Sequence, residues 1–164
     1  SFAQMMRYSL TDAKSSVSLV QELNYIHNYL AIQSIRFGDR IHYEIACDRS
    51  LHSEYIPFFS LQPLVENSIE HGLLNKASGG NLFLSCKDYS THFTIIIQDD
   101  GIGIDAESLD SLTNQFNLEE KQGNEHVGLY NCYKRLQLMF GEKLTFHIES
   151  EEQSGTTITI NLLK

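Results

Sequence analysis

The chain has 164 residues, 41% of them hydrophobic and 20% charged, a balance typical of one soluble globular domain. Its formal net charge of -9 leaves no basic excess to neutralise phosphates, which argues against a general nucleic-acid binder. Cys47, Cys86 and Cys132 are widely spaced and form no C-x-x-C pair, so we expect neither a zinc site nor a disulfide framework, but a reducing compartment.

No apolar run approaches the roughly 18 residues that a membrane-spanning helix needs, and no signal peptide is visible. The chain starts at Ser1, without Met and in the middle of a pattern. We therefore expect it to be a piece of a longer protein.

The N-terminal part is predicted to be helical. Residues 2–10 resemble the end of a helix, and residues 11–16 form a polar break. Ser18, with Gln21 three residues later, predicts a capping box at the start of a long helix that ends at Phe37. Its apolar residues recur at steps of four and three and form a seam: Leu19, Leu23, Ile26 and Leu30. This seam packs either on a partner helix or on the chain's own domain.

The remainder alternates strands and helices. Strands are predicted at 41–46, 81–87, 92–99, 143–150 and 155–163, with a short apolar stretch at 55–59. Helices are predicted at 61–73 and 127–140, and the polar stretch 105–126 is predicted to be a lid or binding loop with a short helix at 106–113. We expect an α+β fold, a two-layer α/β sandwich with a mixed sheet covered by helices. Residues 1–37 would be a separate helical element and 38–164 the main domain.

The helix LQPLVENSIEHGL, residues 61–73, carries the first candidate site. Asn67 offers a neutral carbonyl oxygen, a hard ligand that suits Mg²⁺. Glu66 and Glu70 are placed to bind the waters of such an ion, and His71 lies on the same helix face as Asn67. The alternative is a solvated polar face on a helix that is buried on its other side.

The second candidate is DDGIGI, residues 99–104. Asp99 ends a strand, and its carboxylate can accept a hydrogen bond from the amino group of adenine, which selects adenine over guanine. Gly101 and Gly103 would let the backbone turn and approach the base closely. The alternative is a plain Asp-Gly turn.

The third candidate is GNEHVGLYN, residues 123–131. The backbone N–H groups of Val127, Gly128 and Leu129 would begin a helix, and a helix start attracts anions such as phosphate. The stretch is not a Walker A loop, and DDGIGI lacks the third glycine of a dinucleotide fingerprint.

In this order and spacing, PLVENSIEHGL, DDGIGI, GNEHVGLYN and GTT resemble the N box and the three glycine boxes of sensor histidine kinases. These kinases share their ATP-binding (GHKL) fold with DNA gyrase, heat-shock chaperones and the MutL repair proteins. The upstream ELNYIHNYLAIQSIRFGDRI, residues 22–41, is similar to the segment before the ATP-binding domain in bacterial sensor kinases of the LytS/YesM type. The resemblance covers nearly the whole chain.

The resemblance implies a role for each matching residue. Asn67 would hold Mg²⁺, Asp99 would hold the adenine amino group, and the glycines after Asp99 would shape the base pocket up to Ile104. Residues 105–126 would be the ATP lid. Its far end would contain His126, Val127, Gly128, Leu129 and Asn131, and the back of the adenine pocket would contain Thr156 and Thr157.

The sequence departs from the family pattern at three positions. Glu70 stands where a lysine is usual, which removes a positive contact to phosphate, and His126 replaces the first glycine before the hinge helix. Pro63 stands where hydrolytic relatives keep a catalytic glutamate, so no general base for water is offered there. The absence of that base fits a kinase, whose nucleophile is a histidine side chain.

The expected function is transfer of the ATP γ-phosphate to a histidine on an upstream helix, and from there to the receiver domain of a response regulator. The family's N-P-H-F-x-x-N phosphoacceptor motif is absent from this chain. The resemblance further implies a homodimer in the full-length protein and a position on the cytoplasmic side of a bacterial cell membrane. Two alternatives stay open: a hydrolytic ATPase of the same fold, and a degenerate module that relays conformation without catalysis.

Overall fold

The computed structural model describes residues 15–118 and 127–164. The predicted helix end at 2–10, most of the polar break that follows it, and His126 lie outside the described residues.

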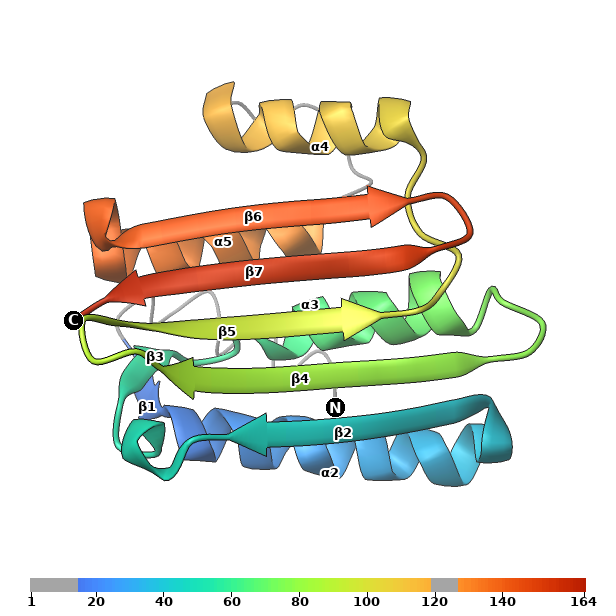
Figure 1. The fold of residues 1–164 in the computed structure, drawn as a ribbon, viewed down its shortest axis with the longest axis horizontal. Helices are drawn as coiled ribbons and strands as arrows, with labels where there is room; N and C mark the ends of the chain where they lie inside the picture. The colour runs from blue at the N-terminus through green and yellow to red at the C-terminus, as the bar shows by residue number, and fades with distance from the viewer. Residues whose placement is uncertain (1–14, 119–126) are drawn as a thin grey trace.

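A five-stranded sheet in the order β2-β4-β5-β7-β6 forms one layer (Figure 1). Strand β2 pairs in parallel with β4, and the three other pairings are antiparallel, so the predicted mixed sheet is confirmed. The five strands match the predicted ones closely: β2 Ile41–Cys47, β4 Gly80–Asp88, β5 His92–Asp99, β6 Leu144–Glu151 and β7 Gly155–Leu163.

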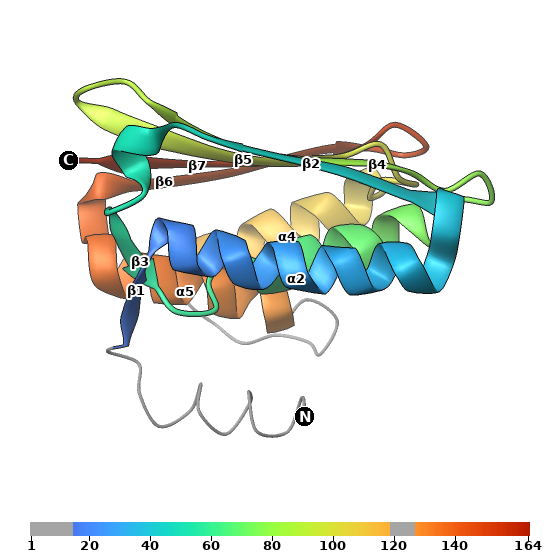
Figure 2. The same cartoon turned by 90° about the horizontal axis from the view of Figure 1, so that it is seen from below.

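The helices form the second layer, and all of the described ones lie on the same face of the sheet (Figure 2). They are α2 Leu19–Phe37, α3 Gln62–Asn67, which continues directly into the π-helical η3 Ser68–Leu73, α4 Ala106–Leu118 and α5 Val127–Phe140. Three short 3₁₀ turns join elements: η1 Gly38–Arg40, η2 Arg49–Leu51 and η4 Gly141–Lys143. The predicted α+β sandwich is confirmed.

Helix α2 begins where the capping pattern predicts. Ser18 is its N-cap, and the Ser18 N–H donates to Gln21 Oε1 at 3.0 Å. The chain before it forms the short strand β1 Ser16–Ser18, which pairs with β3 Tyr55–Pro57 in a separate two-stranded sheet. Strand β1 was not predicted, because three residues are too few to show a period of two.

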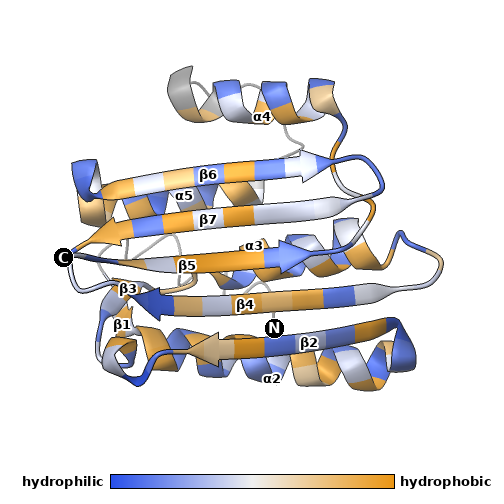
Figure 3. Cartoon of the chain, viewed as in Figure 1, coloured by the Kyte–Doolittle hydropathy of each residue, from blue (hydrophilic) through white to orange (hydrophobic). Residues whose placement is uncertain are grey.

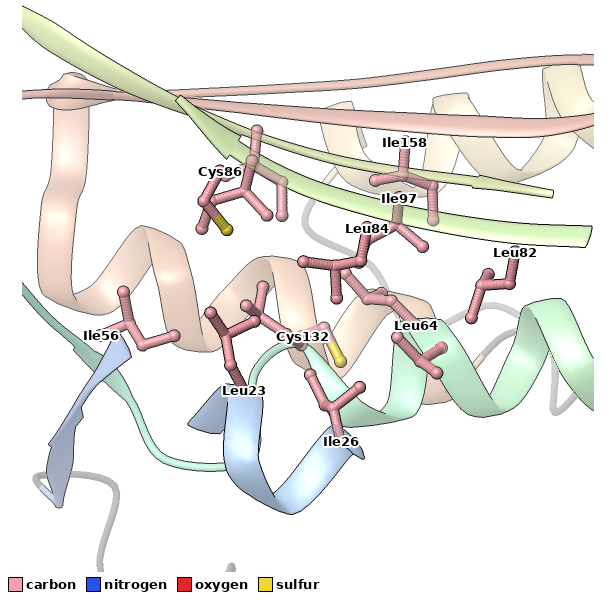
Figure 4. Close-up of a cluster of buried hydrophobic side chains, with 14 of the residues drawn as sticks. Leu23, Ile26, Ile56, Leu64, Leu82, Leu84, Cys86, Ile97, Cys132 and Ile158 are labelled. Carbon is pink, nitrogen blue, oxygen red and sulfur yellow. The ribbon is translucent and has the colours of Figure 1, made fainter. Parts of the chain in front are cut away.

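The seam of α2 packs on the chain's own domain. Its four apolar residues are at most 6% exposed and belong to the same core as the buried face of the sheet. Orange apolar positions line the strands and helices that enclose this core in Figure 3, and Figure 4 shows side chains from α2, α3, α5 and the sheet meeting there. The outer face of the helix leaves Tyr25, Ile32 and Ile35 exposed.

Helix α4 is longer than the predicted 106–113 segment. Asp105 caps its first turn, because its carboxylate accepts hydrogen bonds from the Ser108 N–H at 2.9 Å and the Ser108 hydroxyl at 2.7 Å. Leu112 is fully buried, and Phe116 packs on aromatic rings of α5 and β6. These apolar anchors make the first half of the predicted loop a docked helix.

Glu22 of α2 is a buried carboxylate, 1% exposed, that holds the start of α3. Its Oε2 accepts the Phe59 N–H at 3.0 Å, and its Oε1 accepts the Leu61 N–H at 3.1 Å. Burial raises the pKa of Glu22, while these backbone N–H groups act in the opposite direction. Since the first N–H groups of a helix have no partner within the helix, Glu22 caps α3 from outside.

Helix α5 also holds the segment that precedes α3. Arg135 Nη1 donates to the carbonyl oxygen of Phe58 at 3.0 Å. The segment that leads into α3 is therefore held between two helices. No helix in the described ranges 15–118 and 127–164 is long and apolar enough to cross a membrane.

We predict that Glu22→Ala lowers the free energy of unfolding by about 3 kcal/mol, because it leaves backbone N–H donors buried without an acceptor. Urea unfolding followed by circular dichroism measures this change. Glu44→Ala removes an exposed carboxylate from β2 and should change the stability by less than about 0.5 kcal/mol. Equal effects of the two substitutions would show that Glu22 does not hold the start of α3.

Candidate functional site

One pocket lies where helix α3–η3 faces the end of β5, the start of β7 and the start of α5. Its volume is about 170 Å³, several times the roughly 30 Å³ that one water molecule occupies in the liquid. Its walls combine apolar side chains, glycines and a few polar groups. The lining residues are Leu64, Asn67, Ser68, His71, Gly72, Asp99, Gly103, Ile104, Gly128, Leu129, Thr156 and Ile158.

A change of helical pitch shapes the wall that α3–η3 contributes. The helix has α geometry up to Asn67 and π geometry from Ser68 to Leu73, where the Leu74 N–H donates to the carbonyl of Ile69. A π turn contains an extra residue and shifts the side chains around it, and such turns are frequent at functional sites. Here Asn67, Ser68, His71 and Gly72 all reach the pocket.

Asp99 is the buried acidic group of the pocket, 4% exposed. Burial raises its pKa, and hydrogen bonds from the Ser68 hydroxyl and from the N–H groups of Gly101 and Thr156 oppose that rise. The Gly101 N–H lies 2.9 Å from Oδ1. A carboxylate has about four acceptor positions, so Asp99 can accept a hydrogen bond from a ligand while it keeps the one from Gly101.

The neighbouring Asp100 has a different role. It accepts hydrogen bonds from the N–H and the side-chain amide of Asn81 at 2.8 and 2.7 Å, and its backbone carbonyl accepts one from Lys76. Burial alone would raise the pKa of Asp100, but these contacts hold it below its usual value. Asp100 therefore secures the turn before β4, and Asp99 alone faces the pocket.

Glycines allow the backbone to close tightly around Asp99. A side chain at Gly101 would meet the backbone of Gly72 at 2.5 Å and Asp99 Oδ1 at 2.8 Å. Gly103 has φ +69, and a side chain there would collide with the carbonyl of Glu151. The two glycines of DDGIGI are thus required by close packing around the carboxylate and by the turn after it.

Asn67 faces the beginning of α5 across the pocket. A Cβ atom at Gly128 would be 3.8 Å from Asn67 Nδ2 and 4.0 Å from Oδ1, so the side-chain amide of Asn67 lies close to the backbone of Gly128 without a clash. The first N–H groups of α5, from Val127 onward, have no helical partners. The polar side chain of Asn67 and the start of a helix therefore lie next to each other at the pocket.

Ser150 of β6 ties the strand ends behind the pocket together. Its hydroxyl accepts the Ile104 N–H at 2.8 Å, donates to the carbonyl of Gly155 at 2.8 Å and lies 2.9 Å from Thr156 Oγ1. These bonds fix the chain after Asp99 against the start of β7. Neither Ser150 nor Ser68 was predicted, because the sequence does not show which strand ends and helix turns meet.

The structure brings together eight of the residues singled out in the sequence. They come from all three motifs and the final strand: Asn67, His71, Asp99, Gly103, Ile104, Gly128, Leu129 and Thr156. Gly101 is not a lining residue, but its N–H donates a hydrogen bond to Asp99 Oδ1. His126 lies outside the described residues, and Val127 is described as the first residue of α5.

Glu66 and Glu70 do not line the pocket. Glu66 is half-buried and accepts a hydrogen bond from Gln62 Nε2 at 2.9 Å, and Glu70 is exposed. Burial raises the pKa of Tyr29 in α2, and the two carboxylates raise it further, Glu66 more than Glu70. Both glutamates therefore lie close enough to α2 to affect the charge state of its Tyr29 side chain.

Thr157 and Asn131 are also not among the lining residues. Successive side chains of a strand point to opposite faces, and Thr156 and Ile158 point into the pocket, so Thr157 points to the other face of β7. Asn131 is exposed on α5. Strand β7 therefore lines the pocket with Thr156 and Ile158, and Ile158 was not among the predicted site residues.

The pocket offers a metal ion few protein ligands. The described residues contain no group of three His, Cys, Asp or Glu side chains that could hold a metal ion. Asn67 does present a carbonyl oxygen at the pocket wall. This fits Mg²⁺, which keeps most of its waters and is bound through few protein ligands together with substrate phosphates.

The chain matches two family models. The model described as histidine kinase-, DNA gyrase B-, and HSP90-like ATPase matches residues 59–164, and a histidine kinase model matches residues 1–41. Among curated proteins, the sensor protein kinase HptS of Staphylococcus aureus (strain USA300) is 33% identical over 156 residues. The match covers 95% of this chain and 30% of HptS, so the chain spans about a third of its relative's length.

Solved structures share the fold. The catalytic domain of histidine kinase ThkA superposes with a TM-score of 0.66 at 15% identity, covering 92% of this chain and 96% of that domain. Histidine kinase AdeS of Acinetobacter baumannii superposes with a TM-score of 0.61 at 15% identity, covering 91% of this chain and 66% of AdeS. The first family model covers more than half of the chain and includes every residue that lines the pocket. The chain therefore belongs to the histidine kinase-, DNA gyrase B- and HSP90-like ATPase family and has the fold of histidine kinase catalytic domains.

Proposed function

We propose that this chain is the ATP-binding catalytic part of a bacterial sensor histidine kinase that transfers the ATP γ-phosphate to a histidine on an upstream helix. One observation carries the proposal: a single pocket has the buried carboxylate of Asp99 at one side, and Asn67 beside the start of α5 at another. ATP requires a hydrogen-bond acceptor for the amino group of its base and polar groups for its phosphates, and these residues offer both.

Asp99 would bind the amino group of adenine through its remaining acceptor position. The carboxylate is held in place by donors that do not belong to the ligand, so it needs no rearrangement on binding. Leu64, Ile104 and Ile158 would cover the faces of the base, and Thr156 would close the back of the pocket. A side chain at Gly72 would lie 2.9 Å from Asp99 Oδ1, so glycine at this position keeps the carboxylate free of steric crowding.

Asn67 and the first turn of α5 would receive the phosphates. The N–H groups of Val127, Gly128 and Leu129 begin a helix of 14 residues, and Gly128 has no side chain to block an approach from the pocket. When bound, Mg²⁺ would neutralise phosphate charge, with Asn67 as its protein ligand and Glu66 able to bind one of its waters. His71, exposed at the pocket rim, would lie on the phosphate side.

Catalysis would consist of positioning and charge neutralisation, because phosphoryl transfer leaves little covalent chemistry for the protein. The nucleophile would be a histidine from another segment. Pro63 lies in the first turn of α3, so no carboxylate there can activate water, and this favours the kinase over a hydrolytic ATPase. Exposed Glu70, where the family usually has lysine, would weaken the phosphate contact.

We further propose the wider setting that the relatives suggest. The parent protein would be a sensor kinase of the LytS/YesM type, a homodimer at the cell membrane, with this chain on the cytoplasmic side. Residues 1–37 would belong to its dimerisation and phosphoacceptor region and 38–164 to the ATP-binding domain, in keeping with the separate family match over residues 1–41. The phosphate would then pass to a response regulator receiver domain.

Calorimetric titration with a non-hydrolysable ATP analogue tests the two walls of the pocket. We expect Asp99→Asn to weaken binding by about ten- to a hundredfold, since a hydrogen bond to a charged group contributes roughly 1.5–3 kcal/mol. Asp88→Asn is the matched control, because Asp88 is the last residue of β4, at the end of the strand away from the pocket, and the substitution should leave affinity unchanged. Equal affinities of the two variants would contradict the proposed adenine contact.

The metal contact has its own test in the same titration. With Asn67→Ala, we expect affinity in the absence of Mg²⁺ to stay close to that of the unmodified chain, and the gain on adding Mg²⁺ to be lost. If adding Mg²⁺ raised the affinity of this variant as much as that of the unmodified chain, Asn67 would not be a ligand of the metal. Failure of the unmodified chain to bind adenine nucleotides would favour a conformational relay.

Incubation with γ-labelled ATP and Mg²⁺ tests the reaction. We expect no phosphohistidine on this chain alone, since the phosphoacceptor motif is absent, and labelling of an added fragment that contains an N-P-H-F-x-x-N helix of the same kinase type. Asp99→Asn should abolish that transfer. Phosphohistidine on the isolated chain would overturn the first expectation, and sustained release of phosphate without an acceptor would support the hydrolytic alternative.

A further inference from the structure

Two of the three cysteines meet at the far end of the sheet from the pocket. Cys47 ends β2 and Cys86 lies in β4, and the two residues are direct partners in the parallel pairing of these strands. Side chains of directly paired residues point to the same face of a sheet. The two side chains are therefore neighbours on one face of the sheet, and each thiol affects the pKa of the other.

The spacing of the strands suits a disulfide. Neighbouring strands lie about 4.8 Å apart, and the Cα atoms of disulfide-bonded cysteines are usually about 4.4–6.8 Å apart. Paired positions of parallel strands therefore lie within this range. A bridge that includes half-buried Cys47 on the edge strand is accessible to reductants from solution, and accessible disulfides are the labile, regulatory ones.

The two thiols differ in access. Cys47 is half-buried at the edge strand, and Cys86 is 1% exposed. The hydrogen bond from Cys86 lowers the pKa of Cys47, while the contact with Cys47 and burial raise that of Cys86. Cys47 is therefore the thiol that reacts first with a reagent from solution, and Cys86 is the thiol that resolves the product.

We propose that Cys47 and Cys86 are a reversible dithiol switch that hydroperoxides oxidise to a disulfide. The sulfur of Cys47, as thiolate, attacks one peroxide oxygen, the O–O bond breaks, and water leaves with the displaced oxygen and a proton. The Cys86 sulfur then attacks the sulfenic acid on Cys47, an S–S bond forms, and the hydroxyl leaves as water with the Cys86 proton. Two thiols and one hydrogen peroxide thus give one disulfide and two waters.

The bridge would fasten the edge strand β2 to β4 without entering the ATP site. Along β4, Cys86 lies four residues beyond Leu82, the partner of Asp99, which is about 13 Å of strand. Strand β2 follows α2 through η1, and Cys47 lies at the end of β2 that is farther from this junction. The bridge would therefore fix the far end of the strand that follows the upstream helix. The switch is therefore independent of the proposed nucleotide contacts.

Peptide mapping of the reduced chain after treatment with hydrogen peroxide tests this inference. Trypsin places the cysteines in three separate peptides, 41–49, 77–87 and 122–134. With free thiols blocked before digestion, we expect the first two peptides to be linked, a mass loss of two hydrogen atoms, and one alkylated cysteine where the reduced chain has three. Dithiothreitol should restore all three.

Variants separate the roles of the two thiols. Cys86→Ser should stop the reaction at a sulfenic acid on Cys47 that dimedone traps, and Cys47→Ser should abolish the reaction at Cys86. Cys132→Ser is the control, because Cys132 is buried in α5 and its loss should leave the 41–49 to 77–87 link intact. Direct oxidation of Cys47 to sulfinic acid in the unmodified chain, a link between two copies of Cys47, or no reaction at Cys47 would each overturn the proposal.

Discussion

The helix α3–η3 is held between two buried carboxylates, and the pocket depends on both. Glu22 reaches from α2 and accepts the N–H groups at the start of α3, and Asp99 at the end of β5 interacts with the hydroxyl of Ser68, about two turns further along the helix. Burial of a carboxylate is costly unless donors surround it, so each carboxylate favours the arrangement that supplies its donors. Glu22 thus anchors the helix to α2 at its start, and Asp99 connects it to the end of the sheet at the pocket.

The same arrangement links the upstream helix to the proposed nucleotide site. Helix α2 belongs to the segment that matches the histidine kinase model, and α3–η3 carries Asn67. A displacement of α2 would move Glu22, and with it the cap of the helix that presents Asn67. The site is thus mechanically coupled to the part of the chain that precedes it, through a contact that is separate from the ligand-binding residues themselves.

Most of the fold followed from the sequence, since five strands of alternating pattern and two long amphipathic helices appear close to their predicted bounds. Periodicity also identified the buried seam of α2, but could not say what the seam packs on, because an apolar stripe has no preferred partner. The three motifs pointed to the pocket and to eight of its lining residues. Ser68, Ser150 and Gly72 were not found, because a π turn and the meeting of β6 with the chain after Asp99 are tertiary features. Thr157 was placed in the pocket together with Thr156, although strand alternation separates the two.

The proposed nucleotide site depends on a hydrogen bond from the adenine amino group to Asp99. Calorimetry on the unmodified chain, with Mg²⁺ present, can compare the affinity for ATP with that for GTP. Guanine carries a carbonyl oxygen where adenine has the amino group, so the buried carboxylate would face an acceptor that it cannot bind. We predict that ATP binds at least about tenfold more tightly than GTP, which corresponds to roughly 1.4 kcal/mol. Equal affinity for the two nucleotides would contradict it, because the pocket would then recognise phosphates without reading the base.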